Sequence, residues 1–157
     1  MKYFVNSETG ELFAFDQDAD DATIPSSLSS LTQAEFDELV AAKNTTIDRA
    51  QQITATRYLQ EISGIVVSGV HIDTDRESQA MVAGAALSAV IDPGYVCNWK
   101  TRSGPVRLDA IQLIAVATAV RNHVQACFDR EFALIDLVEK GTFKEYLLEQ
   151  GWPSSTE

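Results

Sequence analysis

A long row of apolar residues at 110–138 constrains the fold of this chain more than any other feature of its sequence. The apolar side chains recur every three to four positions, which is the period of a helix with one buried face. Asp109 is placed to cap this helix, with Gln112 as its partner in a capping box. The row therefore predicts a helix from Ala110 to about Lys140, roughly 45 Å long.

Two short β regions precede this helix. Residues 64–72 read as β structure with Gly69 at a bulge or a turn, and residues 95–106 read as a hairpin with Gly104 in its loop. A long helix beside short strands predicts an α+β fold, in which a small antiparallel sheet packs against a long C-terminal helix.

A further helix is predicted between the two β regions. Thr74 and Glu77 have the spacing of a capping box, which opens a helix through residues 81–91. Small side chains on this segment would let the helix pack close to a neighbour. Asp92, Pro93 and Gly94 end it.

The N-terminal part has its own pattern. Residues 3–13 predict a β-hairpin with Gly10 in its loop, followed by an acidic loop. Thr32 and Glu35 form a capping box that opens a helix ending near Asn44. A second helix is predicted from Ile47 to Ile62, and Gly64 terminates it.

These elements predict four segments along the chain. They are an N-terminal hairpin–helix module at 1–45, a helical connector at 46–62, an α+β main domain at 63–150 and a polar tail at 151–157. The sharp difference in charge between the first part and the rest supports the division.

The net charge of −11 is unevenly distributed. Residues 1–48 hold ten acidic and two basic side chains, whereas residues 49–157 hold thirteen acidic and ten basic ones. Binding to nucleic acid or to an anionic membrane needs a cationic face, so both partners are excluded. Two interpretations stay open, namely solubility and an acidic arm that meets a basic partner.

The chain also lacks the marks of export and of a membrane span. Its first residues contain no apolar run of the kind that a signal peptide needs. Its longest apolar windows stop well short of the ~20 residues that cross a bilayer. We therefore expect a cytosolic protein in which Cys97 and Cys127 stay reduced.

No catalytic signature is present. The sequence contains no GxSxG elbow, Walker loop, GxGxxG turn or HExxH pair, and it has two histidines in all. We expect a protein that is not an enzyme, with no catalytic residues and no cofactor.

Two groups of residues suggest a metal site, and each has a simpler interpretation. His123, Cys127 and Glu131 lie four positions apart and would share one helix face, near His71 in space. The spacing matches no compact zinc signature, and a buried free cysteine usually packs as a small apolar residue. Asp73, Asp75 and Glu77 precede a helix, where capping accounts for the last two. We expect no metal.

The candidate partner-binding residues are Trp99, Lys100 and Arg102. Tryptophan and arginine are enriched among the residues that dominate protein interfaces. The alternative is that Trp99 faces the long helix as part of the core while Lys100 and Arg102 face water, as alternation along a strand would produce.

Three blocks of the sequence carry a resemblance to a known family. They read HIDTDRESQAM from residue 71, WKTRSGPVRLDA from residue 99 and HVQACFDRE from residue 123. In that order they resemble the domain of unknown function on tail-fibre assembly proteins of tailed bacteriophages and prophages. The N-terminal hairpin followed by IPSSLSSLTQAEFDELVAA is similar to the opening of the same proteins, so the resemblance covers most of the chain.

The resemblance implies a chaperone in the bacterial host cytoplasm. Its client would be a phage tail fibre, held near the distal, C-terminal end while it folds or trimerises, with strand addition to an exposed β edge as one mode of binding. The alternative is a structural adaptor that is retained on the fibre or the baseplate. The oligomeric state is left open, a homo-oligomer included.

Overall fold

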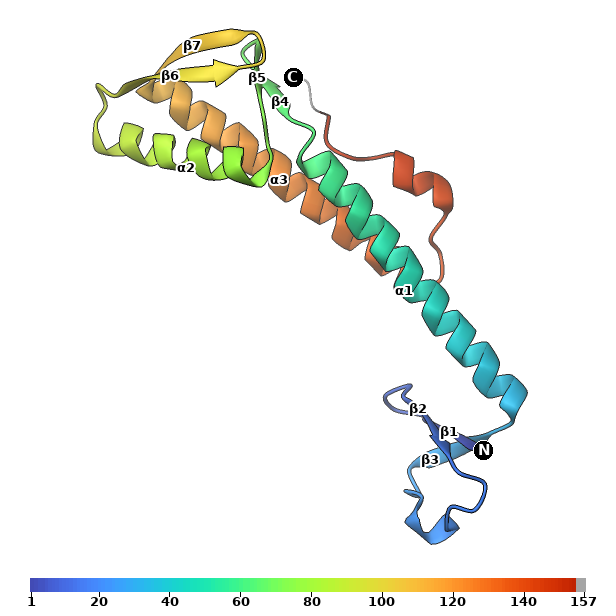
Figure 1. Ribbon diagram of the computed structural model, residues 1–157. Helices are drawn as coiled ribbons and strands as arrows, with labels where there is room; N and C mark the ends of the chain where they lie inside the picture. The colour runs from blue at the N-terminus through green and yellow to red at the C-terminus, as the bar shows by residue number, and fades with distance from the viewer. Residues whose placement is uncertain (155–157) are drawn as a thin grey trace. The chain divides into compact units, whose positions relative to one another are not determined.

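The computed structural model describes residues 1–154 and has the predicted α+β fold, with short antiparallel strands and a long C-terminal helix (Figure 1). The chain divides into two compact units, Met1–Arg49 and Ala50–Glu157. The last three positions of the predicted polar tail at 151–157 lie outside the described residues. The four predicted segment boundaries stay predictions.

The first unit contains a three-stranded antiparallel sheet in the order β2-β1-β3. Its elements are β1 (Lys2–Asn6), β2 (Leu12–Phe15), the 3₁₀ turn η1 (Asp21–Thr23) and β3 (Leu28–Leu31). β1 and β2 form the predicted hairpin, and Gly10 in its loop has a positive φ of 70°. The sequence did not indicate β3, which pairs with β1 so that Leu31 lies opposite Tyr3.

Helix α1 (Gln33–Glu61) begins where the sequence predicted. The backbone N–H of Glu35 donates to the Thr32 hydroxyl at 3.3 Å, and the Glu35 carboxylate accepts from the Thr32 backbone N–H at 2.8 Å. This reciprocal pair is a capping box. The hydrogen bonds from Thr32 lower the pKa of the Glu35 carboxyl.

The predicted end of this helix near Asn44 is wrong, because α1 continues without a break to Glu61. Thr45 and Thr46 donate their hydroxyls to the carbonyls of Ala41 and Ala42, one turn back. Such bonds satisfy short polar side chains inside a helix, so these residues do not end it.

The second unit holds the remaining elements. After the end of α1 come β4 (Ile65–Val67), β5 (Val70–Ile72), α2 (Arg76–Ile91), β6 (Val96–Thr101), β7 (Gly104–Asp109), α3 (Ala110–Glu139) and the 3₁₀ helix η2 (Glu145–Glu149). β4 pairs with β5 and β6 pairs with β7, both antiparallel. The predicted long helix and the 95–106 hairpin are confirmed.

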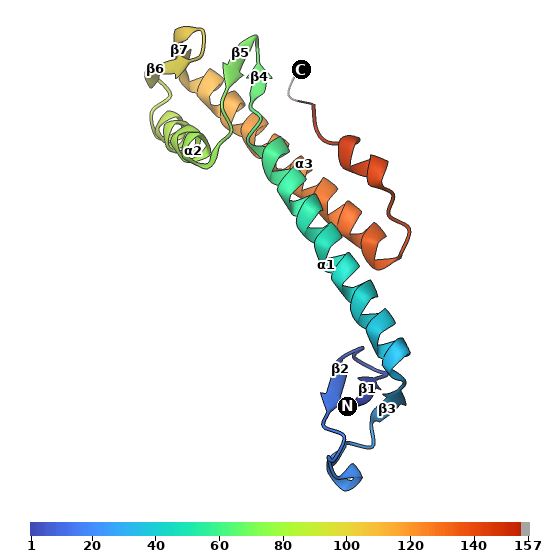
Figure 2. The same cartoon turned by 45° about the vertical axis from the view of Figure 1, so that its right-hand side comes forward.

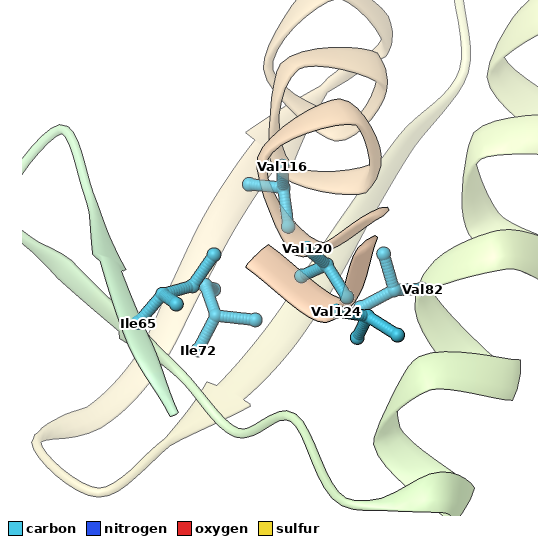
Figure 3. Packing of buried hydrophobic residues seen from close by; sticks show 6 residues of the cluster. All are labelled: Ile65, Ile72, Val82, Val116, Val120 and Val124. Atoms are coloured by element: carbon cyan, nitrogen blue, oxygen red, sulfur yellow. The ribbon is translucent and has the colours of Figure 1, made fainter. Parts of the chain in front are cut away.

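Helix α3 is the element on which the second unit packs. α2 runs antiparallel to its first half, and the β6–β7 hairpin lies at its start (Figures 1 and 2). The buried cluster shown in Figure 3 joins β4, β5, α2 and α3 and consists of Ile65, Ile72, Val82, Val116, Val120 and Val124. Two further clusters continue the core toward the two ends of α3, one of Ala89, Leu108, Ala110 and Leu113 and one of Ile53, Leu134, Val138 and Phe143.

The predicted capping box of Thr74 and Glu77 is wrong, although the helix it announced is present. Asp75 is the N-cap of α2, and its carboxylate accepts from the backbone N–H groups of Glu77 and Ser78. Thr74 is fully buried, and its hydroxyl instead donates to the Glu61 carbonyl at 2.6 Å. The segment after α1 is thereby fixed to the segment before α2.

Within residues 1–154, no helix has both the length and the apolar character that crossing a membrane requires.

Candidate partner-binding surface

Helices α2 and α3 each contain a long run without a charged side chain. Residues 78–91 and residues 110–120 include no Asp, Glu, Lys or Arg, although the formal net charge of the chain is −11. The two runs lie beside each other, since α2 is antiparallel to the first half of α3 (Figures 1 and 2). A neutral, apolar stretch of surface can therefore form across both helices.

Both helices have more apolar residues than they can bury. A helix has one face toward its neighbour, and Val82 and Ala89 of α2 occupy that face against Leu113 and Val116 of α3. The surplus apolar side chains remain in water, and their exposed fractions are Leu87 62%, Val90 65%, Ile91 75%, Ile111 80% and Ile114 40%.

We call these five residues the apolar α2–α3 face. Together they present on the order of 500 Å² of apolar surface, near the upper end of the largest patch on a typical monomer, about 300–600 Å². The largest apolar patch on a monomer is often functional, so this face is the candidate site of interaction with another protein.

A groove runs along this face between the two helices. It has a volume of about 380 Å³ and is lined by Ala86, Leu87, Val90, Ile114, Ala117, Thr118, Arg121 and Asn122. Its charged lining residue, Arg121, lies at one end and donates a hydrogen bond to the Gln125 side chain at 3.1 Å. The groove itself offers alanine and β- or γ-branched side chains, which suit an apolar partner.

The three predicted partner-binding residues lie on and beside the β6–β7 hairpin. Trp99 is half-buried and packs against two of the core clusters, whereas Lys100 is exposed. Arg102 is exposed in the hairpin loop, and its guanidinium donates twice to Asp73 Oδ1, at 3.1 and 2.7 Å. The alternation therefore places Trp99 inward and Lys100 outward.

A shallow hollow connects these residues. It has a volume of about 370 Å³ and is lined by Asp73, Ser78, Met81, Asn98, Trp99 and Lys100. Arg102 is not in the lining but reaches the hollow through its ion pair with Asp73. That Trp99, Lys100 and Arg102 bind a partner stays a prediction.

The row of His123, Cys127 and Glu131 is buried, and its charged member has a partner that the sequence did not indicate. Arg57 of α1 donates from Nε to Glu131 Oε2 at 3.1 Å and from Nη1 to the carboxylate of Glu61. All of these residues are at most 8% exposed. Arg57 is 74 positions from Glu131, so the one available signal was the spacing of Arg57 and Glu61 on one helix face.

The other two members of the row make local contacts. The ring nitrogen Nε2 of His123 lies 3.1 Å from the Gln60 carbonyl and 3.9 Å from Cys127 Sγ. Burial raises the pKa of the Cys127 thiol to about 11, and the nearby Glu61 carboxylate adds to this effect while Arg57 opposes it. In the part of the chain that the structure describes, no three His, Cys, Asp or Glu side chains are grouped so that they could hold a metal ion.

The second acidic group is also accounted for by contacts within the chain. Asp75 caps α2, and the Ser78 hydroxyl lowers the pKa of its carboxyl by donating to it. Asp73 binds Arg102. These carboxylates therefore serve the helix terminus and the hairpin loop.

We predict that Cys127 does not react with a thiol reagent such as DTNB in the folded protein at pH 8. The thiolate is the reactive species, and a pKa of about 11 leaves roughly one thiol in a thousand ionised. In a Cys97→Ser variant, the remaining thiol should react only after denaturant is added. The matched Cys127→Ser variant keeps the half-buried Cys97 as a comparison. Rapid reaction of Cys127 in the native protein would contradict the assignment.

Sequence reasoning missed the apolar α2–α3 face. The signal was present as two uncharged runs in which apolar residues occupy more than one helix face. The small side chains of the first run indicated only a helix that packs close to a neighbour. The sequence does not show which face that neighbour leaves uncovered.

The comparisons with known proteins give one match. The model of a family described as a domain of unknown function (DUF4376) matches residues 41–149, about two thirds of the chain. Every residue of the apolar α2–α3 face lies inside the matched region. No curated protein and no solved structure matches the chain.

Proposed function

The chain belongs to the DUF4376 family, whose function is unknown, and for this member we propose the function of an assembly chaperone that binds apolar surface on an unfinished protein. The observation that carries this proposal is the apolar α2–α3 face, with side chains 40–80% exposed. The resemblance of its sequence blocks to tail-fibre assembly proteins supplies the client. That client is a phage tail fibre, bound near its distal, C-terminal end in the bacterial host cytoplasm.

The apolar α2–α3 face has the properties that such a chaperone needs. A fibre subunit that has not yet met its partners exposes apolar surface and unpaired strand edges, which favour aggregation. A chaperone has to offer apolar surface of its own. Because the five residues of the apolar α2–α3 face are uncharged, binding there desolvates little charge on the chaperone side, and Arg121 is the charged residue of the groove lining.

The charge of the remaining chain supports the same function. A net charge of −11 keeps a protein and its bound client dispersed, and acidic side chains improve solubility more than basic ones do. An apolar binding face on a strongly acidic body is therefore suited to hold an aggregation-prone client in solution.

We predict that Leu87→Glu lowers the yield of soluble, trimeric fibre when the chain is co-expressed with the proposed tail-fibre client. A glutamate in the middle of an apolar contact has to lose its hydration without a counterion, which should weaken binding at least tenfold, or about 1.4 kcal/mol. Size-exclusion chromatography of the soluble fraction measures the trimer. The matched control is Leu59→Glu, which makes the same change at a residue of α1 that is 64% exposed.

Each outcome of this experiment has a defined meaning. Fibre that folds equally well without the chain would remove the chaperone function. Recovery of the chain from purified phage particles would favour the structural adaptor on the fibre or the baseplate. Equal yields with Leu87→Glu and with Leu59→Glu would place client binding outside the apolar α2–α3 face, and the hollow beside Trp99 would be tested next.

A further inference from the structure

We propose that a second copy of this chain covers the apolar α2–α3 face when no client is bound, so that the chaperone is stored as a twofold-symmetric dimer. The function of this dimer as a reserve rests on the proposed chaperone function, because both partners would use the same face. The dimer itself follows from the size of the face, its shape and the charges at its two ends.

The face supplies more than half of the area that a standard interface buries on each partner. A standard interface buries about 800 Å² on each partner, and the five residues of the apolar α2–α3 face supply on the order of 500 Å² of apolar surface. The alanines, Thr118 and Asn122 that line the groove extend the area around them. This composition, an apolar centre with a polar rim, is that of homodimer interfaces.

A face that has both a groove and projecting apolar side chains can pack against a copy of itself. The groove of about 380 Å³ lies between a ridge of Leu87 and Val90 on α2 and Ile114 on α3. Ala86 and Ala117 in its lining allow another helix to approach closely. A twofold axis through the face would place the ridge of each copy in the groove of the other, as in helix-to-helix packing of a four-helix bundle.

The charges at the ends of the face favour an antiparallel arrangement of the two copies. Because α2 and α3 are antiparallel, Asp92 after α2 and Asp109 before α3 lie at one end (Figure 1). Arg121, the charged residue of the groove lining, lies toward the other end. A twofold axis perpendicular to the helices brings Arg121 of each copy to the acidic end of its partner, whereas a twofold axis along the helices would place the two arginines together.

The test measures the mass of the full chain by size-exclusion chromatography with light scattering at about 50 µM. The wild-type protein should have twice the chain mass of 17.2 kDa. Leu87→Glu should elute as a monomer with an unchanged circular dichroism spectrum, and the matched Leu59→Glu should remain a dimer. Arg121→Glu should raise the dissociation constant several-fold, and the charge exchange Asp92→Arg in the same chain should restore it.

Three results would overturn the dimer. They are a wild-type monomer at this concentration, a dimer that Leu87→Glu leaves intact, and a dimer that Leu59→Glu disrupts equally. The fibre experiment fails independently of these results. A monomeric protein that still raises the fibre yield would remove only the dimer, and a dimer that has no effect on the fibre would remove only the chaperone function. If both proposals hold, adding fibre should dissociate the dimer. The product should be a complex with one copy of the chain at each binding site on the fibre.

Discussion

Replacing Arg57 by methionine is expected to destabilise the second unit by about 3–5 kcal/mol, the cost of removing one partner from a buried ion pair. The side chains of Arg57, Glu61 and Glu131 are each less than one tenth exposed. The substitution would leave two carboxylates in the interior without their cation. The guanidinium also lies 4.4 Å above the Phe128 ring, a contact that methionine cannot replace electrostatically. Urea unfolding followed by circular dichroism measures the loss.

Two controls distinguish the loss of the pair from the loss of packing. Arg107→Met removes an exposed arginine from β7 and should change the free energy of unfolding by at most about 0.5 kcal/mol. Replacing Arg57, Glu61 and Glu131 together by methionine removes all three charges and should restore most of the stability. If Arg57→Met cost no more than Arg107→Met, the buried ion pair would have no part in holding α1 to α3.

The elements that were predicted correctly are those whose signals are local. Helix α3 was found at Ala110 because the capping box of Asp109 and Gln112 directly precedes the apolar row. Its end, Glu139, is one residue from the expected Lys140. The β6–β7 hairpin was found because a glycine separates its two β-prone runs, although in the structure Gly104 is the first residue of β7 and pairs with Thr101. In these segments the sequence alone indicates both the type of element and the residues at which it begins and ends.

The errors come from contacts that are distant in sequence or from weak local signals. β3 has two apolar residues, Leu28 and Leu31, and becomes a strand through its pairing with β1, more than twenty positions away. The break expected in α1 near Asn44 rested on residues that favour caps but do not require one. The capping role expected for Asp75 at the start of α2 is confirmed, whereas the capping box expected of Thr74 is absent because the Thr74 hydroxyl donates to the Glu61 carbonyl at the end of α1.

The candidate site shows the same limit more clearly. One of the two interpretations of β6 placed Trp99 inward and Lys100 outward by alternation, and the burial along β6 alternates in this way. The apolar α2–α3 face could not be derived in this way, since it depends on which side of α2 the other elements cover. The partners of Glu131 come from α1, and no pattern around Glu131 indicates them. Local periodicity indicates on which face of its helix or strand a residue lies. Only the tertiary structure shows which of these faces remain exposed to solvent.

Trp99→Ala is expected to lower the free energy of unfolding by about 3 kcal/mol, the lower end of the range for removing a large aromatic side chain from a core. Trp99 is half-buried, yet it packs against both the cluster of Val82 and Val116 and the cluster of Leu108 and Leu113. Removing the indole would leave space between the β6–β7 hairpin and the two helices. Urea unfolding gives the loss in stability.

The neighbouring strand position provides the control and separates the two interpretations of this tryptophan. Lys100→Ala changes an exposed side chain of the same strand and should alter stability by at most about 0.5 kcal/mol. If Trp99→Ala unfolds like the wild type but weakens fibre binding by about 1–3 kcal/mol, Trp99 is an interface anchor. A loss of stability at Trp99 together with unchanged fibre binding in Lys100→Ala would instead assign the tryptophan to the core. Client binding would then depend on the apolar α2–α3 face, where Leu87→Glu tests it without disturbing a buried residue.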